Sequence, residues 1–438
     1  MIINFVLPSI GASGGIDVVY KYVELLTLRG HDVCVYKELC ASNMHRYQSK
    51  LKNLIHQIYC SVKAVVKKDD YQHDVDRYVW FLSDKTVRDA DITIATAWPT
   101  AFKVANLSES KGKKYYFIQG YETWDNAELV KQSYKLPLNK IVISSWINSC
   151  LKMDLGIGPF PIVYNGIDLN LFHPVEVKKQ NDKINFLMLN HTLPKKGVKY
   201  GIEAYEKVVM NHPNCKLRMF GMCGPENLPE YVEYYQNPSK DKLLELYSMS
   251  DIFIFSSVEE GWGLTPLEAM ACGCVVVGTN VGFVPDLGRH KENMMISEPR
   301  DIGGMVANIE DLLKNPKLMQ EIKNRMKCEL PKLSWEASVN KFKRLAVSLK
   351  LGPSKVATSM TIFCVFSSIL VLSAPMTPAT HPTPLSVETM ISLGSSLYSS
   401  PSNKIAFSSN PVFTTNSFLV NFNIFSGNST FPRNNLCN

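Results

Sequence analysis

The chain has 438 residues, a formal net charge of +7, and a composition that is 45% hydrophobic and 20% charged. This length is enough for two domains that each bury a core, and the composition is ordinary for a globular protein. The mild positive charge suits an enzyme that handles diphosphates or contacts an anionic membrane, and it does not indicate a nucleic-acid partner. The eleven cysteines are scattered, which fits neither a disulfide framework nor the paired spacing of a zinc site.

The first part of the chain alternates short apolar runs with amphipathic ones. Residues 2–7 (IINFVL) predict a buried strand, and residues 16–28 have helical spacing that ends at Gly30. Later strands are predicted over residues 32–36, 92–95, 115–118, 141–143 and 162–164. This succession predicts a doubly wound parallel sheet. The N-terminal residues lack the basic start and the cleavage site of a signal peptide, so we expect a cytoplasmic protein.

A turn-rich stretch over residues 165–182 interrupts this rhythm, which then restarts. Strands are predicted over residues 185–189, 217–220, 252–255 and 275–277, with helices over 198–210, 240–249 and 266–271. We therefore expect an α/β protein with two Rossmann-like domains, residues 1–170 and 171–333, that face each other across a cleft. A last helix, residues 334–351, is expected to return toward the first domain.

Residues 352–438 differ in character from the rest of the chain. Their only charges are Lys355, Glu388, Lys404 and Arg433, among many Ser, Thr, Asn, Pro and Phe residues. Residues 356–374 form an uncharged run of about the length that spans a bilayer, although its serines and threonines weaken that interpretation. Three interpretations stay open: a disordered tail, a weak membrane anchor, and an extension unrelated to the rest.

Residues 258–279 (VEEGWGLTPLEAMACGCVVVGT) lie between two predicted strands of the second domain. Thr265 is predicted to be the N-cap of a helix, with Pro266 as its first residue and Glu268 closing a capping box. A helix N-terminus behind a glycine-bearing loop, at the carboxyl end of a parallel strand, favours a bound diphosphate. The alternative is that Glu268 only caps its helix and Glu260 is a solvated acid.

The whole string resembles the E-x7-E motif of the family 4 retaining glycosyltransferases, which have the GT-B fold. The positions that match are Glu260, Gly261, Gly263, Leu264, Pro266, Glu268, Ala269, Met270 and Gly273. The resemblance implies that Glu268 binds the ribose hydroxyls of the nucleotide and that Glu260 contacts the transferred sugar. It also implies that the backbone N–H groups of Gly263, Leu264 and Thr265 hold the sugar or the distal phosphate.

Residues 189–205 (LNHTLPKKGVKYGIEAY) carry a second match. The family places an arginine and a Lys-Gly pair here, and both cations bind the diphosphate. Lys196 and Gly197 fit this pattern, but His191 stands at the arginine position, where neutral imidazole is a weaker anion ligand than guanidinium. Either His191 donates a single hydrogen bond or Lys195 compensates. The alternative is that the two lysines are only solvated.

Two candidates lie in the first domain. Gly14 and Gly15 belong to GASGGI (residues 11–16) between the first strand and the first helix, where the family binds donor phosphates and acceptor. Gln119 ends a predicted strand at the position where many family members have His or Gln near the sugar, which implies that it stabilises charge at the reaction centre. The alternatives are a tight turn for the glycines and a structural amide for Gln119.

The resemblance implies that a hexose-type sugar passes, with retention of configuration, from a nucleotide-diphosphate sugar to a glycan or lipid-linked acceptor, as in polysaccharide biosynthesis. The leaving phosphate would assist the acceptor on the same face, so the protein mainly positions groups and stabilises charge. No cofactor is expected. Of two Asp-x-Asp strings, the one at residues 74–76 precedes residues 78–82 and the one at 89–91 leads into the strand predicted over 92–95, and we predict that no metal is essential.

Residues 49–68 (SKLKNLIHQIYCSVKAVVKK) place apolar side chains on one helical face and five lysines elsewhere. Such a helix either lies on an anionic bilayer as a peripheral contact or packs on the sheet with its lysines in water. Because fold does not determine function, three rivals stay open. They are a nucleotide-sugar epimerase, a phosphorylase of the same fold, and a non-catalytic membrane-associated scaffold.

Overall fold

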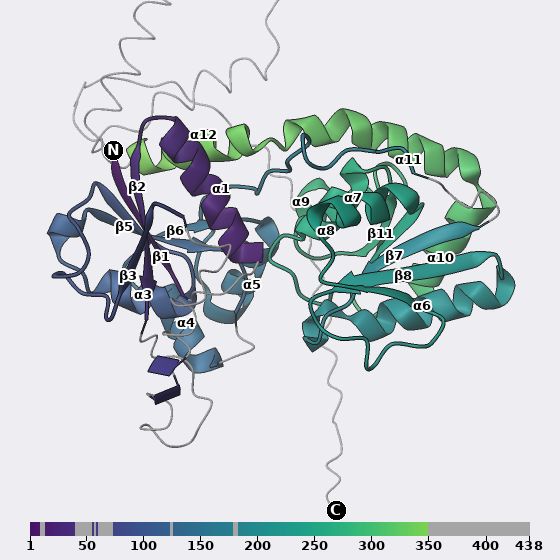
Figure 1. Cartoon of the computed structure of the whole chain (residues 1–438), viewed down its shortest axis with the longest axis horizontal. Coiled ribbons are helices and arrows are strands. Elements are labelled where there is room, and N and C mark those ends of the chain that lie inside the picture. Colours follow the sequence, from purple (N-terminus) through teal and green to yellow (C-terminus); the bar gives the residue numbers. More distant parts are fainter. Residues whose placement is uncertain are drawn as a thin grey trace, which may run out of the picture. The chain divides into compact units, whose positions relative to one another are not determined.

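The computed structural model describes residues 1–8, 14–39, 55–56, 58–59, 73–122, 126–177 and 183–348. These residues contain two six-stranded sheets within one compact unit, residues 1–361 (Figure 1). The predicted tail, residues 352–438, lies outside the described residues, as does all of the amphipathic segment 49–68 except residues 55–56 and 58–59. The interpretations offered for both segments therefore stay predictions.

The first sheet has the strand order β3-β2-β1-β4-β5-β6, and its neighbouring strands are all parallel. Its strands are β1 (Ile2–Leu7), β2 (Asp32–Glu38), β3 (Asp76–Val79), β4 (Ile92–Ala95), β5 (Lys113–Ile118) and β6 (Asn139–Val142). Its helices are α1 (Gly14–Leu28), α3 (Trp98–Ala105), α4 (Ala127–Lys135) and α5 (Ser145–Leu155). Helices cover both faces of a parallel sheet, which is why β1 is apolar apart from Asn4 and is buried from Ile3 to Leu7.

The second sheet repeats this topology in the order β12-β11-β10-β7-β8-β9, again with parallel neighbours. Its strands are β7 (Ile184–Leu189), β8 (Cys215–Gly221), β9 (Glu233–Gln236), β10 (Ile252–Phe255), β11 (Val275–Thr279) and β12 (Met295–Ser297). Its helices are α6 (Val198–Asn211), α7 (Lys240–Met249), α8 (Leu264–Ala271), α9 (Val284–Leu287), α10 (Ile302–Lys314) and α11 (Pro316–Glu329). The two sheets confirm the predicted α/β class with two Rossmann-like halves.

The last helix, α12 (Trp335–Ser348), packs beside α1 (Figure 1). The ring of Phe342 stacks on Phe5 of β1 with centroids 6.4 Å apart, and Trp335 meets Tyr22 of α1 edge to face at 5.9 Å. These aromatic contacts hold the end of the described chain against the first sheet. The domain boundaries predicted from the sequence stay predictions, because the two sheets lie in one compact unit.

The structure corrects one predicted strand and adds three short ones. Residues 162–164 form no strand, and only an isolated bridge joins Ile162 to Val142. Pro161 contributes a carbonyl to β6 but has no N–H to extend the pairing. The strands β3 (DRYV), β9 (EYYQ) and β12 (MIS) were not predicted, because each carries charged or polar residues and lacks the continuous apolar run that marks β10 (IFIF).

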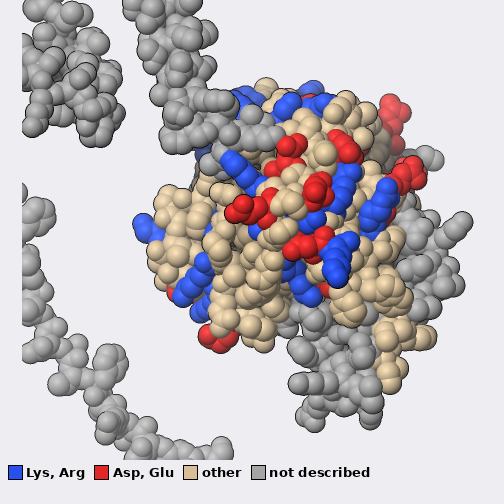
Figure 2. Space-filling model, turned by 90° about the vertical axis from the view of Figure 1, so that its left-hand side faces the viewer, with Lys and Arg blue, Asp and Glu red and all other residues tan. Residues whose placement is uncertain are grey.

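The surface charges are mixed rather than segregated on the face that Figure 2 shows, where Lys and Arg side chains alternate with Asp and Glu. This mixture agrees with the mild net charge of +7 and with the many surface ion pairs between neighbouring side chains, such as Lys207 with Glu203. Among the described helices, none has the length and apolar character needed to cross a membrane.

Candidate functional site

The site lies at the switch points of the second sheet. Strands β7 and β10 are neighbours in this sheet, but the chain continues from β7 to β8 on one side and from β10 to β11 on the other. The loops that follow β7 and β10 therefore lie next to each other at the carboxyl edge of the sheet. The loop after β7 carries His191 and Lys196, and the loop after β10 carries Glu260. The topology therefore brings these three predicted residues to one place.

Lys196 and Glu260 form an ion pair in which the ammonium lies 2.5 Å from Oε2. Both side chains are mostly buried, with exposed fractions of 20% and 17%. Gly197 allows this contact, because it has φ of 62° and a Cβ there would lie 2.0 Å from the Ser256 carbonyl oxygen. Only glycine lets the two loops approach so closely. The sequence match at Lys196 and Gly197 thus corresponds to a direct packing contact between the two loops.

His191 is placed to donate one hydrogen bond. Its Nδ1 accepts from the Leu193 N–H at 3.0 Å, so the neutral ring carries its proton on Nε2. Burial lowers the pKa of His191, and the charges of Lys196 and Lys195 lower it further. Lys195 also fixes the neighbouring loop, because its carbonyl accepts from the Val258 N–H at 2.7 Å. This geometry leaves the Nε2–H of the neutral ring as the one donor that His191 could offer to a ligand, and which of the two alternatives holds stays a prediction.

The first sheet contributes Gln119, which follows β5 and touches both the first helix and the loop after β10. A Cβ on Gly15 would lie 3.6 Å from Gln119 Oε1, and one on Gly261 would lie 2.0 Å from the Gln119 carbonyl oxygen. Gln119 Oε1 is buried and accepts no hydrogen bond from the described residues. The Ser144 hydroxyl donates to the Gly261 carbonyl at 2.8 Å, a contact that no sequence motif indicated. Gly14 faces open space.

The helix α8 begins two residues earlier than predicted. Gly263 is its N-cap with φ of 96°, and no side chain caps it. The predicted capping box of Thr265 and Glu268 is therefore wrong, because a left-handed glycine starts the helix at Leu264 and leaves Thr265 in the first turn. Among the residues that the structure describes, no side chain caps these first-turn N–H groups, and an anion is a suitable acceptor for them.

Glu268 instead accepts a hydrogen bond from the Tyr247 hydroxyl at 2.9 Å. With Leu264, Asp17 and Lys240 it lines a cavity of about 800 Å³. Burial raises the pKa of Glu268 to about 7, the hydrogen bond from Tyr247 opposes this rise, and Asp17 adds to it. No sequence signal pointed to Tyr247, which has the spacing of a core residue in α7.

The predicted residues thus fall into two groups. His191, Lys196 and Glu260 lie together with Gln119 and Gly15, whereas Leu264 and Glu268 face the cavity beside α1. The loop of residues 260–264 connects the groups directly, since its first residue carries the ion pair and its last lines the cavity. An extended ligand that reached both groups would contact this loop and the N-terminus of α8.

The Asp-x-Asp strings make structural contacts. Asp76 pairs with Lys37 at 2.8 Å, with both side chains 2% exposed, and it accepts from the Tyr20 hydroxyl. Asp89 accepts from Lys111 and from Ser110. Within the described part of the chain, no cluster of three or more His, Cys, Asp or Glu side chains could hold a metal ion. That no metal is essential remains a prediction.

Two parallel sheets whose carboxyl edges meet through such loops define the GT-B fold. Sucrose-phosphate synthase from Thermosynechococcus elongatus shares it, with a TM-score of 0.61 and 17% sequence identity over 80% of this chain and 99% of that one. At this identity the likeness shows the fold alone.

Residues 172–328 match the family model described as glycosyl transferases group 1. The serotype-specific mannosyltransferase WbdA of Escherichia coli is 30% identical over 125 residues, which are 28% of this chain and 15% of that protein. The N-acetyl-alpha-D-glucosaminyl L-malate synthase of Bacillus anthracis is 30% identical over 180 residues, 37% of this chain and 46% of that protein. The chain therefore spans less than half the length of these two curated relatives.

Proposed function

We propose that the protein is a retaining glycosyltransferase that moves a hexose-type sugar from a nucleotide-diphosphate sugar to a glycan or lipid-linked acceptor. The observation that carries the proposal is the Lys196–Glu260 pair, which lies at the edge of the second sheet within reach of α8 and the first sheet. The match to the group 1 family model supports the reaction class, as do the names of a mannosyltransferase and an N-acetylglucosaminyl-malate synthase among the relatives.

Each part of the donor has a matching group in this arrangement. The diphosphate would bind the first-turn N–H groups of α8, the Lys196 ammonium and the Nε2–H of His191. Glu268 would accept from the ribose hydroxyls, and Glu260 from hydroxyls of the sugar. The two glutamates would thus recognise the ribose and the sugar, and the positive charge of Lys196 would lie beside the diphosphate, which is the leaving group.

The reaction requires stabilisation of the charge that develops as the sugar leaves the diphosphate. Lys196 and the N-terminus of α8 would stabilise the negative charge on the phosphate. The leaving phosphate oxygen then accepts the proton of the acceptor hydroxyl on the same face of the sugar, which retains the configuration. The buried Oε1 of Gln119 is an acceptor that can stabilise positive charge on the sugar ring. No covalent sugar–protein intermediate is needed.

A thermal-shift screen of the full-length chain against UDP-, GDP-, ADP- and dTDP-sugars identifies the donor, because a ligand of the folded state raises the melting temperature. Transfer is then measured as release of nucleotide in the presence of an acceptor. Release without an acceptor would favour an epimerase or a hydrolase, and release that depends on inorganic phosphate would favour a phosphorylase.

Glu260→Gln is the sharpest test of the site, because the substitution keeps the shape and removes the charge. We expect transfer to fall at least about a hundredfold, since the sugar loses a charged hydrogen-bond partner. Glu259→Gln makes the same change at the adjacent residue and should retain activity. Full transfer by Glu260→Gln, in a protein that melts like the wild type, would contradict the proposed site.

A further inference from the structure

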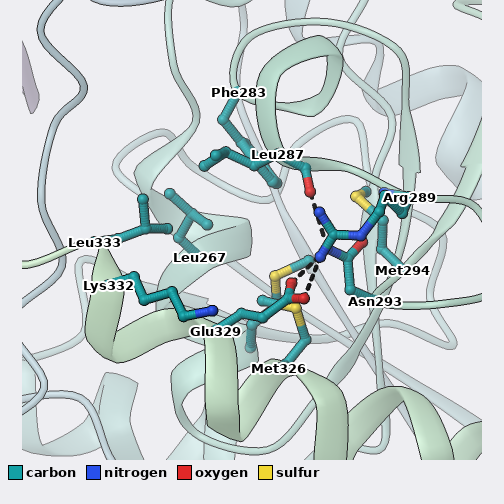
Figure 3. A pocket seen from close by; sticks show the side chains of 11 residues that line it. Leu267, Phe283, Leu287, Arg289, Asn293, Met294, Met326, Glu329, Lys332 and Leu333 are labelled. Carbon is teal, nitrogen blue, oxygen red and sulfur yellow. Dashed lines mark hydrogen bonds and ion pairs between the residues drawn. The ribbon is translucent and has the colours of Figure 1, made fainter. Parts of the chain in front are cut away.

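A second, smaller cavity lies against another face of α8 (Figure 3). It has a volume of about 160 Å³ and is formed by α8, the segment around α9, and the end of α11 with the turn that follows. Its lining residues are Leu267, Met270, Phe283, Leu287, Arg289, Asn293, Met294, Met326, Glu329, Lys332 and Leu333. None of them belongs to the donor site described above.

The floor of this cavity is apolar and buried. Leu267, Met270, Phe283, Met294 and Met326 line it, and each is 6% exposed or less. Figure 3 shows the side chains of Leu267, Phe283, Met294 and Met326 around the space. A closed apolar cavity of roughly 150 Å³ takes up a benzene-sized molecule, and this cavity, which opens to solvent on one side, has a comparable volume. The three methionines are flexible and adapt to the shape of an occupant. The floor therefore fits an aromatic ring or a short alkyl chain.

The mouth of the cavity carries charge. Glu329 is already neutralised, because it is paired with Arg289 and accepts from the Asn293 amide at 2.9 Å. Arg325 adds a further contact to Glu329 at 3.3 Å. The Lys332 ammonium, in contrast, makes no hydrogen bond or ion pair with the part of the chain that the structure describes. The charged lining groups, Arg289, Glu329 and Lys332, sum to one positive charge.

We propose that this cavity is a binding site for a small organic monoanion whose apolar body is the size of an aromatic ring or a six-carbon chain. The apolar body occupies the floor, and the carboxylate faces Lys332 at the mouth. The site is independent of the proposed transfer reaction. Its floor includes Leu267 and Met270 of α8, the helix that also carries Glu268, so an occupant contacts a helix shared by both cavities.

Methyl NMR of the full-length chain, labelled at its methionine methyl groups, tests the site with hexanoate as the probe. We expect saturable shifts at Met270, Met294 and Met326 with affinity in the millimolar range, as is usual for a ligand of this size. Met153 and Met210, which are 78% and 80% exposed, serve as internal references and should not shift. No shift at the three cavity methionines, or an equal shift at all methionines, would overturn the proposal.

Two substitutions separate the apolar from the charged part of the site. Lys332→Gln should weaken hexanoate binding about two- to fivefold, as expected for a partly exposed ion pair, and leave 1-hexanol binding unchanged. Lys327→Gln, at an exposed position of α11, is the matched control and should change neither. Met326→Phe fills the floor and should abolish the shifts at Met270 and Met294. If Lys332→Gln leaves hexanoate binding unchanged, or if Met326→Phe binds it normally, the assignment is wrong.

Discussion

The Lys196 ammonium lies 2.5 Å from the carboxylate of Glu260, although 64 residues separate the two in the chain. The contact exists because the loops after β7 and β10 pack against each other through Gly197. In the proposed donor site, a diphosphate bound by Lys196 would share this ammonium with Glu260.

Lys196→Gln should weaken binding of the nucleotide sugar about tenfold to a hundredfold, because a hydrogen bond to a charged group contributes about 1.5–3 kcal/mol. Isothermal titration calorimetry with the donor found in the screen measures the change. Lys199→Gln is the matched control, since Lys199 is exposed at the start of α6. Equal affinities of the Lys196→Gln protein and the wild type would remove Lys196 from the donor site.

His191→Ala should weaken donor binding less than Lys196→Gln does, by about two- to tenfold, because a neutral hydrogen bond contributes about 0.5–1.5 kcal/mol. The lowered pKa of His191 keeps the ring neutral above pH 7. The affinity ratio of wild type to His191→Ala should therefore stay constant between pH 7 and pH 8. His191→Arg should bind the donor more tightly than the wild type, because guanidinium adds a charge. A ratio that changes over this range would show that the ring titrates there.

Glu268 should make stability depend on pH. Its pKa of about 7 lies above the value of 4.5 expected for an unfolded chain, so the folded state holds its proton more tightly. The resulting stabilisation is fully present below about pH 4.5 and is lost as the pH rises through 7. Glu268→Gln removes this dependence. Relative to that variant, the unfolding free energy of the wild type should fall by at most about 3 kcal/mol from pH 4.5 to pH 8.

Urea denaturation of both proteins at the two pH values checks this expectation. Titrating groups other than Glu268 contribute about equally to both proteins and cancel in the comparison. A stability difference between wild type and Glu268→Gln that does not change with pH would contradict the raised pKa.

Gly261→Ala should disturb the contact between the two sheets. The added Cβ would lie 2.0 Å from the Gln119 carbonyl oxygen, so the loop after β10 or the end of β5 must shift. We expect a loss of about 1–3 kcal/mol in unfolding free energy together with weaker donor binding. Gly120→Ala is the control, because a Cβ there meets nothing within 4 Å. Thermal unfolding and calorimetry of both variants provide the measurement, and equal stability of the two would contradict the close packing.

Much of the fold follows from local patterns in the sequence. Residues 252–255 are an apolar run of strand length, as are residues 2–7 apart from Asn4, and they form β10 and β1. Residues 240–249 have helical spacing after a serine, and Ser239 indeed caps α7. The strands can be predicted from such patterns because a parallel sheet is buried on both faces, which favours continuous apolar strands. The strand–helix alternation then predicts two doubly wound sheets without knowledge of any contact.

The details of the site depended on tertiary contacts. Thr265 and Glu268 have the spacing of a capping box, yet Gly263 starts the helix earlier and Tyr247, from another helix, binds Glu268. The sequence by itself determined which residue types stand after each strand: Lys196 after β7, Glu260 after β10 and Gln119 after β5. Only the tertiary structure decided which of them touch, because these contacts join loops far apart in the chain through glycines where any side chain would clash.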